Sequence, residues 1–337
     1  MIIRHDFSLL KYNNLKLDCK AANFTKITII SELTEFKNMI SNQTDRINII
    51  GSGSRILLTG DLPGLTVQNS LRGADIVREN EDHVIVGVNS GERWDKLVDW
   101  TLKNQIFGLE NLSGIQGTVA GAVINNAGAF GVQVSDVIEG VVGVGMDSSK
   151  ESKMTPEECK FNYHSSIFKT ELKGKFFIYR VLLRLSRKPD LKTNYREIKQ
   201  GLMYAGEQEI TPILIREILL KYLSRREPGY KFPNAGSFFK NPVVDLESGD
   251  KLKEQFPDIV LNKIDEAGIK IPAGWLIKKA GWIGQKIGNA AVYKPNPAIL
   301  INLGNAKPMD FLVLMNAIKN DVFEKMGVTL EEEIEKF

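Results

Sequence analysis

The stretch Ile47-Asn48-Ile49-Ile50-Gly51-Ser52-Gly53-Ser54-Arg55-Ile56-Leu57-Leu58-Thr59 runs from one apolar segment through a glycine-rich turn into another. Its two apolar ends are typical of strands. Upstream, residues 24–30 predict a strand, and Ser31 is expected to cap a helix that carries Leu33, Phe36 and Ile40 at helical spacing. A Rossmann fingerprint needs its glycine loop to open a helix, so this strand–loop–strand order excludes that fold.

A second run of small residues occupies positions 117–131, Gly-Thr-Val-Ala-Gly-Ala-Val-Ile-Asn-Asn-Ala-Gly-Ala-Phe-Gly. Glycine removes the side chain that would keep a ligand away from backbone N–H groups, and such loops bind anions. Taken singly, the first loop can be a hairpin turn and the second a tightly packed helix. Two such loops in one half of the chain favour a long ligand with a pyrophosphate, such as a nucleotide cofactor.

The remaining pattern mixes strands and helices and predicts an α/β (α+β) fold. Expected strands cover 83–88, 137–144, 175–185 and 298–303, and expected helices follow Ser90, start at Pro212 and run from Pro308 to Gly327. The sequence Arg-Arg-Glu-Pro-Gly at 225–229 is typical of a hinge, and we expect the main domain boundary there.

The run Asn234-Ala235-Gly236-Ser237-Phe238-Phe239-Lys240-Asn241-Pro242 places one hydroxyl between a glycine and two aromatic rings. A serine hydroxyl can donate a proton, and the rings could close a dry pocket around it. The alternative is a buried turn whose two phenylalanines belong to the core.

The C-terminal segment 328–334 alternates as a strand. Val328, Leu330 and Ile334 would face the core, and Glu331 and Glu333 would share the other face. A solvated acidic tail is the alternative.

Composition excludes several classes of protein. The chain has 337 residues, enough for two or three lobes, and a net charge of +3, too small for a nucleic-acid coat. Two distant cysteines and three scattered histidines predict neither a disulfide framework nor a metal site. The sequence contains no signal peptide and no apolar run of about 18 residues. We therefore expect a cytoplasmic monomer that binds neither nucleic acid nor a membrane.

The chain resembles the UDP-N-acetylenolpyruvoylglucosamine reductase family, flavoenzymes of peptidoglycan synthesis, over nearly its whole length. The motifs that carry the resemblance are Gly51–Ser54, Gly108–Leu112, Asn126–Gly131, Tyr163–Lys169, the Ser237 run and Ala273–Ile277. The glycine loops are shared with the wider vanillyl-alcohol oxidase group, whereas the Ser237 run is specific to the family. The length, and the segment around Tyr195, are similar to the longer of the family's two subtypes.

This resemblance implies a two-lobed FAD-binding domain of the vanillyl-alcohol oxidase type and a C-terminal α/β substrate domain. The FAD-binding domain is expected at 1–224, with lobes at about 1–70 and 71–224. The substrate domain is expected at 225–327, and a terminal strand at 328–337 would return to the active site.

The family's chemistry implies roles for individual residues. NADPH reduces FAD, a hydride passes from the flavin N5 to the enolpyruvyl carbon, and Ser237 protonates the neighbouring carbon. Glu333, with a cation at position 164, would stabilise the negative charge that develops. The implied cofactor-binding residues are Gly51, Ser52, Gly53, Ser54, Arg55, Ile115, Gly117, Thr118, Gly121, Ala122, Asn126, Gly128, Ala129 and Gly131. The implied UDP-sugar-binding residues are Tyr163, Tyr195, Arg225, Arg226, Lys240 and Asn241.

His164 stands where the family has an arginine. Arginine is permanently charged and forked, whereas histidine is only partly protonated near neutral pH. Either the substrate carboxylate keeps His164 charged, in which case activity falls as pH rises through the histidine pKa, or His164 is a spacer and another cation such as Lys240 supplies the charge.

Other departures from the family pattern are Arg55 for asparagine, Gln116 and Val123 for prolines, Phe130 for tyrosine and Glu335 for arginine. They leave open a diverged paralogue acting on a related enolpyruvyl nucleotide, or a non-catalytic flavin- or nucleotide-sugar-binding protein. A flavin oxidase of the wider group is a third alternative.

Overall fold

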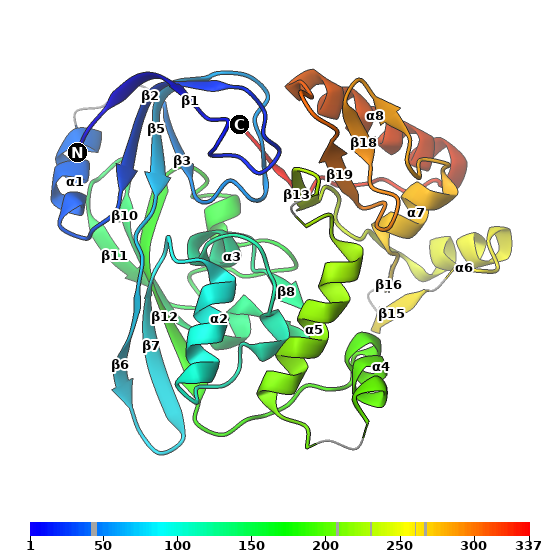
Figure 1. Cartoon of the computed structure of the whole chain (residues 1–337), viewed down its shortest axis with the longest axis horizontal. Coiled ribbons are helices and arrows are strands. Elements are labelled where there is room, and N and C mark those ends of the chain that lie inside the picture. The colour runs from blue at the N-terminus through cyan, green and yellow to red at the C-terminus, as the bar shows by residue number, and fades with distance from the viewer. Residues whose placement is uncertain (42–45, 207–208, 230, 260, 266–267) are drawn as a thin grey trace. The chain divides into compact units, whose positions relative to one another are not determined.

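The computed structural model describes residues 1–41, 46–206, 209–229, 231–259, 261–265 and 268–337 (Figure 1). The chain divides into two compact units. Unit 1 contains Met1–Phe7, Ala21–Gly53 and Leu62–Arg225, and unit 2 contains Ser8–Lys20, Ser54–Asp61 and Arg226–Phe337. Two N-terminal segments therefore belong to the C-terminal unit. The functional domain ranges expected from the sequence remain a prediction.

The described part of unit 1 contains two large sheets and one short hairpin. The first has the strand order β1 (Arg4–Ser8), β2 (Lys20–Ile27), β5 (Leu62–Asn69) and β3 (Ile47–Ile50). Strand β5 lies between β2 and β3 and is parallel to both. The second has the order β11 (Glu151–Met154), β10 (Ile138–Gly145), β12 (Phe176–Ser186), β7 (His83–Asn89) and β6 (Ala74–Glu79), with every pair antiparallel.

Unit 1 also contains helices. They are α1 (Glu32–Ser41), α2 (Trp94–Lys103), α3 (Val119–Ile124), α4 (Arg196–Ala205) and α5 (Pro212–Arg226), with short 3-10 turns at Glu110–Leu112, Val134–Val137 and Ile167–Lys169 and a hairpin of β8 (Gly128–Ala129) and β9 (Val132–Gln133). Helices α2 and α3 bury their apolar sides with β7 and β12 in one core, which contains Trp94, Val119 and Val181. Helix α1 packs Leu33, Phe36 and Ile40, as predicted, in a second core.

Among its described residues, unit 2 contains three smaller groups of strands and three helices. The groups are β13 (Asn234–Ser237), β19 (Ile299–Asn302), β18 (Ala290–Val292) and β17 (Lys286–Ile287); β14 (Val243–Val244), β16 (Gly268–Lys270) and β15 (Asn262–Asp265); and the pair β4 (Ile56–Leu57) and β20 (Glu335–Lys336). The helices are α6 (Leu246–Gln255), α7 (Ala273–Lys279) and α8 (Pro308–Met326).

Helix α8 has the predicted ends. Pro308 occupies its first turn, and Gly327 ends it with a φ of 66°, a left-handed conformation that glycine adopts without strain. Its buried side includes Phe311, whose ring stacks on Phe238 with centroids 5.8 Å apart. Phe238 and Phe239 are both buried, as the alternative of two core residues expects, and the pocket around Ser237 stays a prediction.

Three local predictions need correction. Ser90 does not cap α2: the helix begins after Arg93, and the buried Ser90 hydroxyl donates to the Ile178 carbonyl at 2.7 Å. Arg225 and Arg226 form the last turn of α5, so the hinge begins after them. Residues 328–334 form no regular strand, although Val328, Leu330 and Ile334 are buried as expected.

No helix among the described residues is long and apolar enough to cross a membrane.

We expect Phe238→Ala to lower the free energy of unfolding by about 3–5 kcal/mol, because it removes a fully buried ring and leaves a cavity beside Phe311. Phe323→Ala, on the exposed side of α8, is the matched control and should change stability little, since its ring is 58% exposed. Denaturant unfolding measures both. Equal losses for the two variants would contradict the assignment of Phe238 to the core.

Candidate active site

Ser237 is the last residue of β13, where the strand pairs with Ile299 of β19. The next residue, Phe238, donates its N–H to the Ala298 carbonyl at 3.0 Å, so the chain on both sides of the hydroxyl is held. Ser237 is half-buried, and its hydroxyl has no hydrogen-bond partner among the residues that the structure describes. The hydroxyl is therefore available to a ligand from a fixed backbone.

The C-terminal segment binds to this same stretch of backbone. The Glu333 N–H donates to the Phe238 carbonyl at 2.8 Å, and the Lys240 N–H donates to the Glu331 carbonyl at 2.9 Å. An antiparallel bridge between Phe239 and Glu332 lies between these two bonds. Glu333 is thus fixed beside the residue that follows Ser237, which excludes the alternative of a solvated tail at this point.

The Glu333 carboxylate is buried, with 6% of the residue exposed, and it accepts a hydrogen bond from Nη1 of Arg55. Arg55 is joined to the same segment by its backbone, because the Glu335 N–H donates to the Arg55 carbonyl at 3.1 Å. The sequence predicted Arg55 only as part of the flavin loop. In the structure its side chain forms an ion pair within unit 2.

In unit 1 the two glycine-rich loops lie against each other. A Cβ at Gly51 would lie 2.8 Å from Oγ1 of Thr118, a distance that real side chains do not adopt. Thr118 caps α3 by accepting a hydrogen bond from the Gly121 N–H at 3.3 Å. Gly51 is therefore required for close contact with the start of α3, and this close approach of the two glycine-rich loops, here called the cradle, is the candidate cofactor site.

The start of α3 is held by the strand-to-helix connection before α2. The Trp94 N–H donates to the Gly117 carbonyl at 3.1 Å, and the N–H groups of Val119 and Ala120 donate to the carbonyls of Glu92 and Ser90. The start of α3 is thus held by backbone hydrogen bonds. Of the predicted cofactor residues, Gly117 directly precedes the cap of α3, and Gly121 and Ala122 lie in the helix itself.

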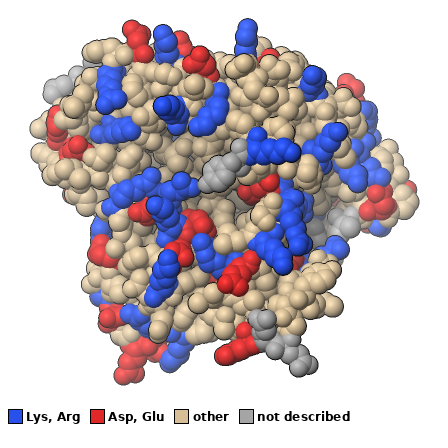
Figure 2. Space-filling view, viewed as in Figure 1, with Lys and Arg blue, Asp and Glu red and all other residues tan. Residues whose placement is uncertain are grey.

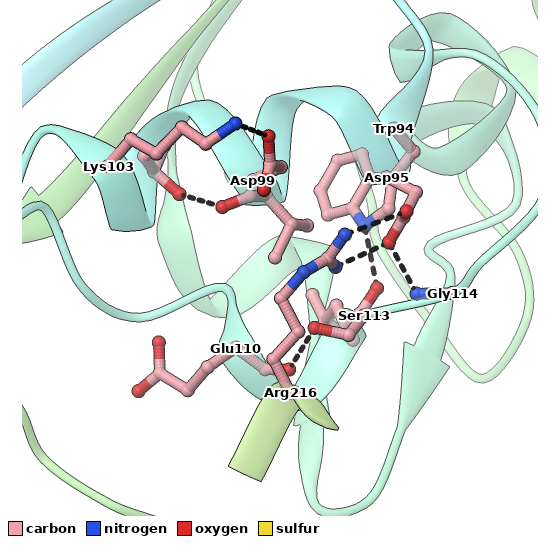
Figure 3. A network of polar contacts seen from close by, with 11 residues as sticks. Trp94, Asp95, Asp99, Lys103, Glu110, Ser113, Gly114 and Arg216 are labelled. Carbon is pink, nitrogen blue, oxygen red and sulfur yellow. Dashed lines mark hydrogen bonds and ion pairs between the residues drawn. The ribbon is translucent and has the colours of Figure 1, made fainter. Parts of the chain in front are cut away.

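An ion pair between α2 and α5 fixes the loop that leads into this cradle (Figure 3). Arg216 contacts Asp95 through two hydrogen bonds, of 2.6 and 2.9 Å, and Asp95 also accepts the Gly114 N–H at 2.7 Å. Ile115, predicted as a cofactor residue, follows directly. No pattern in the sequence indicated this pair, because 121 positions separate its members.

The charge state of Asp95 follows from these contacts. Burial opposes its ionisation, but the hydrogen bonds from Arg216 and Gly114 and the positive charge of Arg216 outweigh burial, and the pKa of Asp95 lies below its usual value.

The Asn126–Gly131 motif forms a hairpin rather than an open loop. The buried Asn126 amide donates to the Asn162 carbonyl and accepts the Ser135 N–H, so this side chain braces the hairpin. A Cβ at Gly131 would lie 2.8 Å from the Tyr195 ring. Tyr195, predicted to bind substrate, therefore packs against the hairpin that carries Gly128, Ala129 and Gly131.

His164 has a φ of 47°, a left-handed conformation for a residue other than glycine. The rings of Tyr163 and His164 lie edge to face with centroids 4.4 Å apart. Lys169 donates to the His164 carbonyl at 3.3 Å and to Asn125 at 2.7 Å. A lysine thus lies beside the backbone of His164 in unit 1.

The other predicted residues are placed as follows. Ser52 and Gly53 continue the turn in unit 1, whereas Ser54 begins the next segment of unit 2. Arg225 and Arg226 are exposed at the end of α5. Lys240 pairs with Glu331 at 3.2 Å, and Asn241 accepts the Ala273 N–H at the start of α7 at 2.8 Å.

Charged side chains of both signs lie over the face drawn in Figure 2. Among the described residues, no group of three or more His, Cys, Asp or Glu side chains could hold a metal ion.

Comparisons with known proteins give consistent results. A family model described as UDP-N-acetylenolpyruvoylglucosamine reductase, C-terminal domain, matches residues 227–337, and one described as FAD binding domain matches residues 27–146. The UDP-N-acetylenolpyruvoylglucosamine reductase of Alcanivorax borkumensis is 36% identical over 329 residues, which is 97% of this chain and 94% of the relative. That of Flavobacterium johnsoniae is 33% identical and covers 99% of each chain.

A solved structure, the UDP-N-acetylenolpyruvylglucosamine reductase of Thermus caldophilus, matches with a TM-score of 0.69 over 100% of both chains. At 22% identity this match concerns the fold, and with the FAD-binding family model it confirms the predicted fold class.

We expect Gly51→Ala to weaken FAD binding to the apoprotein, because the new methyl group must displace Thr118 and disturb the cap of α3. Gly60→Ala is the matched control, since a Cβ there meets no atom within 4 Å. Flavin fluorescence titration measures both, and an unchanged affinity in Gly51→Ala would contradict the cradle.

The ion pair of Asp95 predicts a pH dependence of stability. Its folded-state pKa is lowered, so its contribution is complete above the ordinary aspartate pKa of about 3.9 and is lost as pH falls through the lower folded value. The stability difference between the parent and Asp95→Asn should therefore shrink in that acidic range. Asp99→Asn, which removes an exposed pair with Lys103, is the control. A difference independent of pH would refute this account.

Proposed function

The chain belongs to the UDP-N-acetylenolpyruvoylglucosamine reductase family, and from this premise we propose that it catalyses the NADPH-dependent reduction of the enolpyruvyl ether of UDP-N-acetylglucosamine enolpyruvate to UDP-N-acetylmuramate. Relatives that cover nearly the whole chain favour this reaction over a diverged or non-catalytic paralogue. The protein is then an FAD-containing oxidoreductase of peptidoglycan synthesis.

Unit 1 holds the cofactor in this proposal. The cradle of Gly51, Gly117 and Thr118 is the proposed site for the pyrophosphate of FAD, because glycine-rich loops let backbone N–H groups approach an anion closely. Bound FAD supplies two-electron chemistry, taking hydride from NADPH and giving it to the terminal carbon of the enolpyruvyl group.

Ser237 supplies the proton. Hydride addition leaves negative charge on the carbon bonded to the ether oxygen, and this charge spreads into the neighbouring carboxylate. A hydroxyl is a weak acid, but the carbanion is a strong base, so transfer is feasible from a donor held in place. The observation that carries the proposal is the available Ser237 hydroxyl, with Glu333 fixed beside the next residue by the bond to Phe238.

The remaining residues bind the substrate. Tyr163, Tyr195, Arg225, Arg226, Lys240 and Asn241 are the proposed contacts of the UDP-sugar. Arginines suit its pyrophosphate, because the guanidinium fork pairs with phosphate oxygens. Either His164 or, with His164 as a spacer, a cation such as Lys240 is proposed as a source of positive charge for the carboxylate. A monomer in the cytoplasm is the proposed state of the protein.

The test is NADPH oxidation by the purified flavoprotein with and without UDP-N-acetylglucosamine enolpyruvate. We expect oxidation that depends on this substrate and forms UDP-N-acetylmuramate. A flavin that NADPH reduces, and that this substrate never reoxidises, would overturn the proposed reaction.

Ser237→Ala should slow reoxidation of the reduced flavin by the substrate by about 10²–10⁴-fold, the usual contribution of a general acid. Reduction of the flavin by NADPH should be unchanged, because that step needs no proton from Ser237. Stopped-flow absorbance separates the two half-reactions, and Ser248→Ala on α6 is the control. Slowing of both half-reactions together would argue against a role for Ser237 in protonation.

A further inference from the structure

The Arg55–Glu333 ion pair places a permanent cation next to the proposed proton donor. Both members belong to unit 2, as does Ser237. We consider contact between this cation and the carboxylate of the enolpyruvyl group. Such a contact rests on the proposed function and adds one residue to the proposed substrate contacts.

Glu333 needs a cation at this position. A carboxylate with 6% of its residue exposed loses most of its hydration, which is unfavourable unless a partner and further hydrogen bonds compensate. Arg55 supplies that charge through a charge-assisted hydrogen bond.

Arg55 has more donors than this bond uses. A guanidinium carries five N–H groups, and one nitrogen, Nη1, contacts Glu333. The other donors have no acceptor among the residues that the structure describes, and 35% of the side chain is exposed. The group is therefore partly exposed and retains hydrogen-bonding capacity toward a ligand.

The second terminal nitrogen of Arg55 lies beside the residue before Ser237. A Cβ at Gly236 would lie 3.6 Å from Nη2, and Gly236 has a φ of 74°, which a side chain would strain. The guanidinium thus borders the backbone that carries the hydroxyl.

The position of Arg55 is fixed at both ends. Its carbonyl accepts the Glu335 N–H, the next residue, Ile56, pairs in parallel with Glu335, and the guanidinium binds Glu333. A preorganised arginine loses little side-chain entropy when it binds a second carboxylate.

We propose that Arg55 binds the carboxylate of the enolpyruvyl group beside Ser237, with Glu333 orienting the guanidinium. This assigns the side chain to the substrate and not to the flavin loop. Where negative charge spreads into that carboxylate during reduction, a permanently charged, bidentate donor stabilises it more effectively than a neutral group.

The test compares two ligands that differ in the carboxylate. UDP-N-acetylmuramate carries it on the lactyl ether, and UDP-N-acetylglucosamine lacks it. Binding of each to the oxidised holoenzyme is measured by calorimetry for the parent, Arg55→Gln, Arg55→Lys and the control Lys251→Gln, which removes an exposed ion pair on α6.

In Arg55→Gln we expect UDP-N-acetylmuramate to bind about tenfold or more weakly, the usual range for a hydrogen bond to a charged group, with UDP-N-acetylglucosamine changed less than about twofold. Arg55→Lys should recover part of the loss, and Lys251→Gln should bind both ligands like the parent. The FAD content should stay close to that of the parent in every variant, and Lys251→Gln should also be reduced by NADPH at the parent rate.

Equal weakening of both ligands in Arg55→Gln, or of neither, would overturn the proposal. A fall in FAD affinity with unchanged ligand selectivity would contradict the proposal and show that Arg55 binds the flavin. A lower melting temperature as the sole change would also contradict it and show that the ion pair with Glu333 only stabilises the fold. Because this test needs no turnover, it is independent of the substrate-dependent NADPH assay, whose failure would count against the proposed reaction.

Discussion

The hydrogen bond from the Glu333 N–H to the Phe238 carbonyl is the interaction on which the candidate site in unit 2 depends. It joins the last residues of the chain to the strand end that carries Ser237, and the neighbouring Lys240–Glu331 bond and Phe239–Glu332 bridge prevent the segment from sliding. A carboxylate near a chain terminus is thereby held as firmly as one on a strand. The stacked core rings of Phe238 and Phe311 support this backbone.

Ion pairs between distant parts of the chain are the second constraint. Glu333 in unit 2 and Asp95 in unit 1 are each paired with an arginine from a distant part of the chain, Arg55 and Arg216 respectively. Each arginine also joins backbone segments: Arg55 lies next to strand β4, which pairs with the C-terminus, and Arg216 lies on α5. In both units one ion pair therefore fixes a loop with a proposed chemical role. Removing one partner would leave the other charge poorly solvated and destabilise the protein. The same change would release the loop that the pair holds.

Two of the departures from the family pattern are explained by these contacts. Arg55 and Glu335, both noted as substitutions in the sequence, contact each other through the backbone at the proposed site. Arg55 directly precedes β4 and Glu335 begins β20, and these two strands pair in unit 2, so the two substitutions lie side by side. His164, in unit 1, lies beside Lys169.

The sequence by itself determined the elements with strong local signals. The β3–loop–β4 order, the α8 helix with Pro308 and Gly327 at its ends, and the family motifs around Ser237 all depend on residues close together in the chain, whose conformational preferences act locally. Only the tertiary structure decided that Phe238 and Phe239 are core, that segments Ser8–Lys20 and Ser54–Asp61 belong to the second unit, and that Arg55 pairs with Glu333. Those facts depend on contacts between residues far apart in the chain, which no local periodicity encodes. The sequence was sufficient to identify Ser237 as the candidate proton donor, whereas long-range packing determined that Arg55 and Glu333 lie near it.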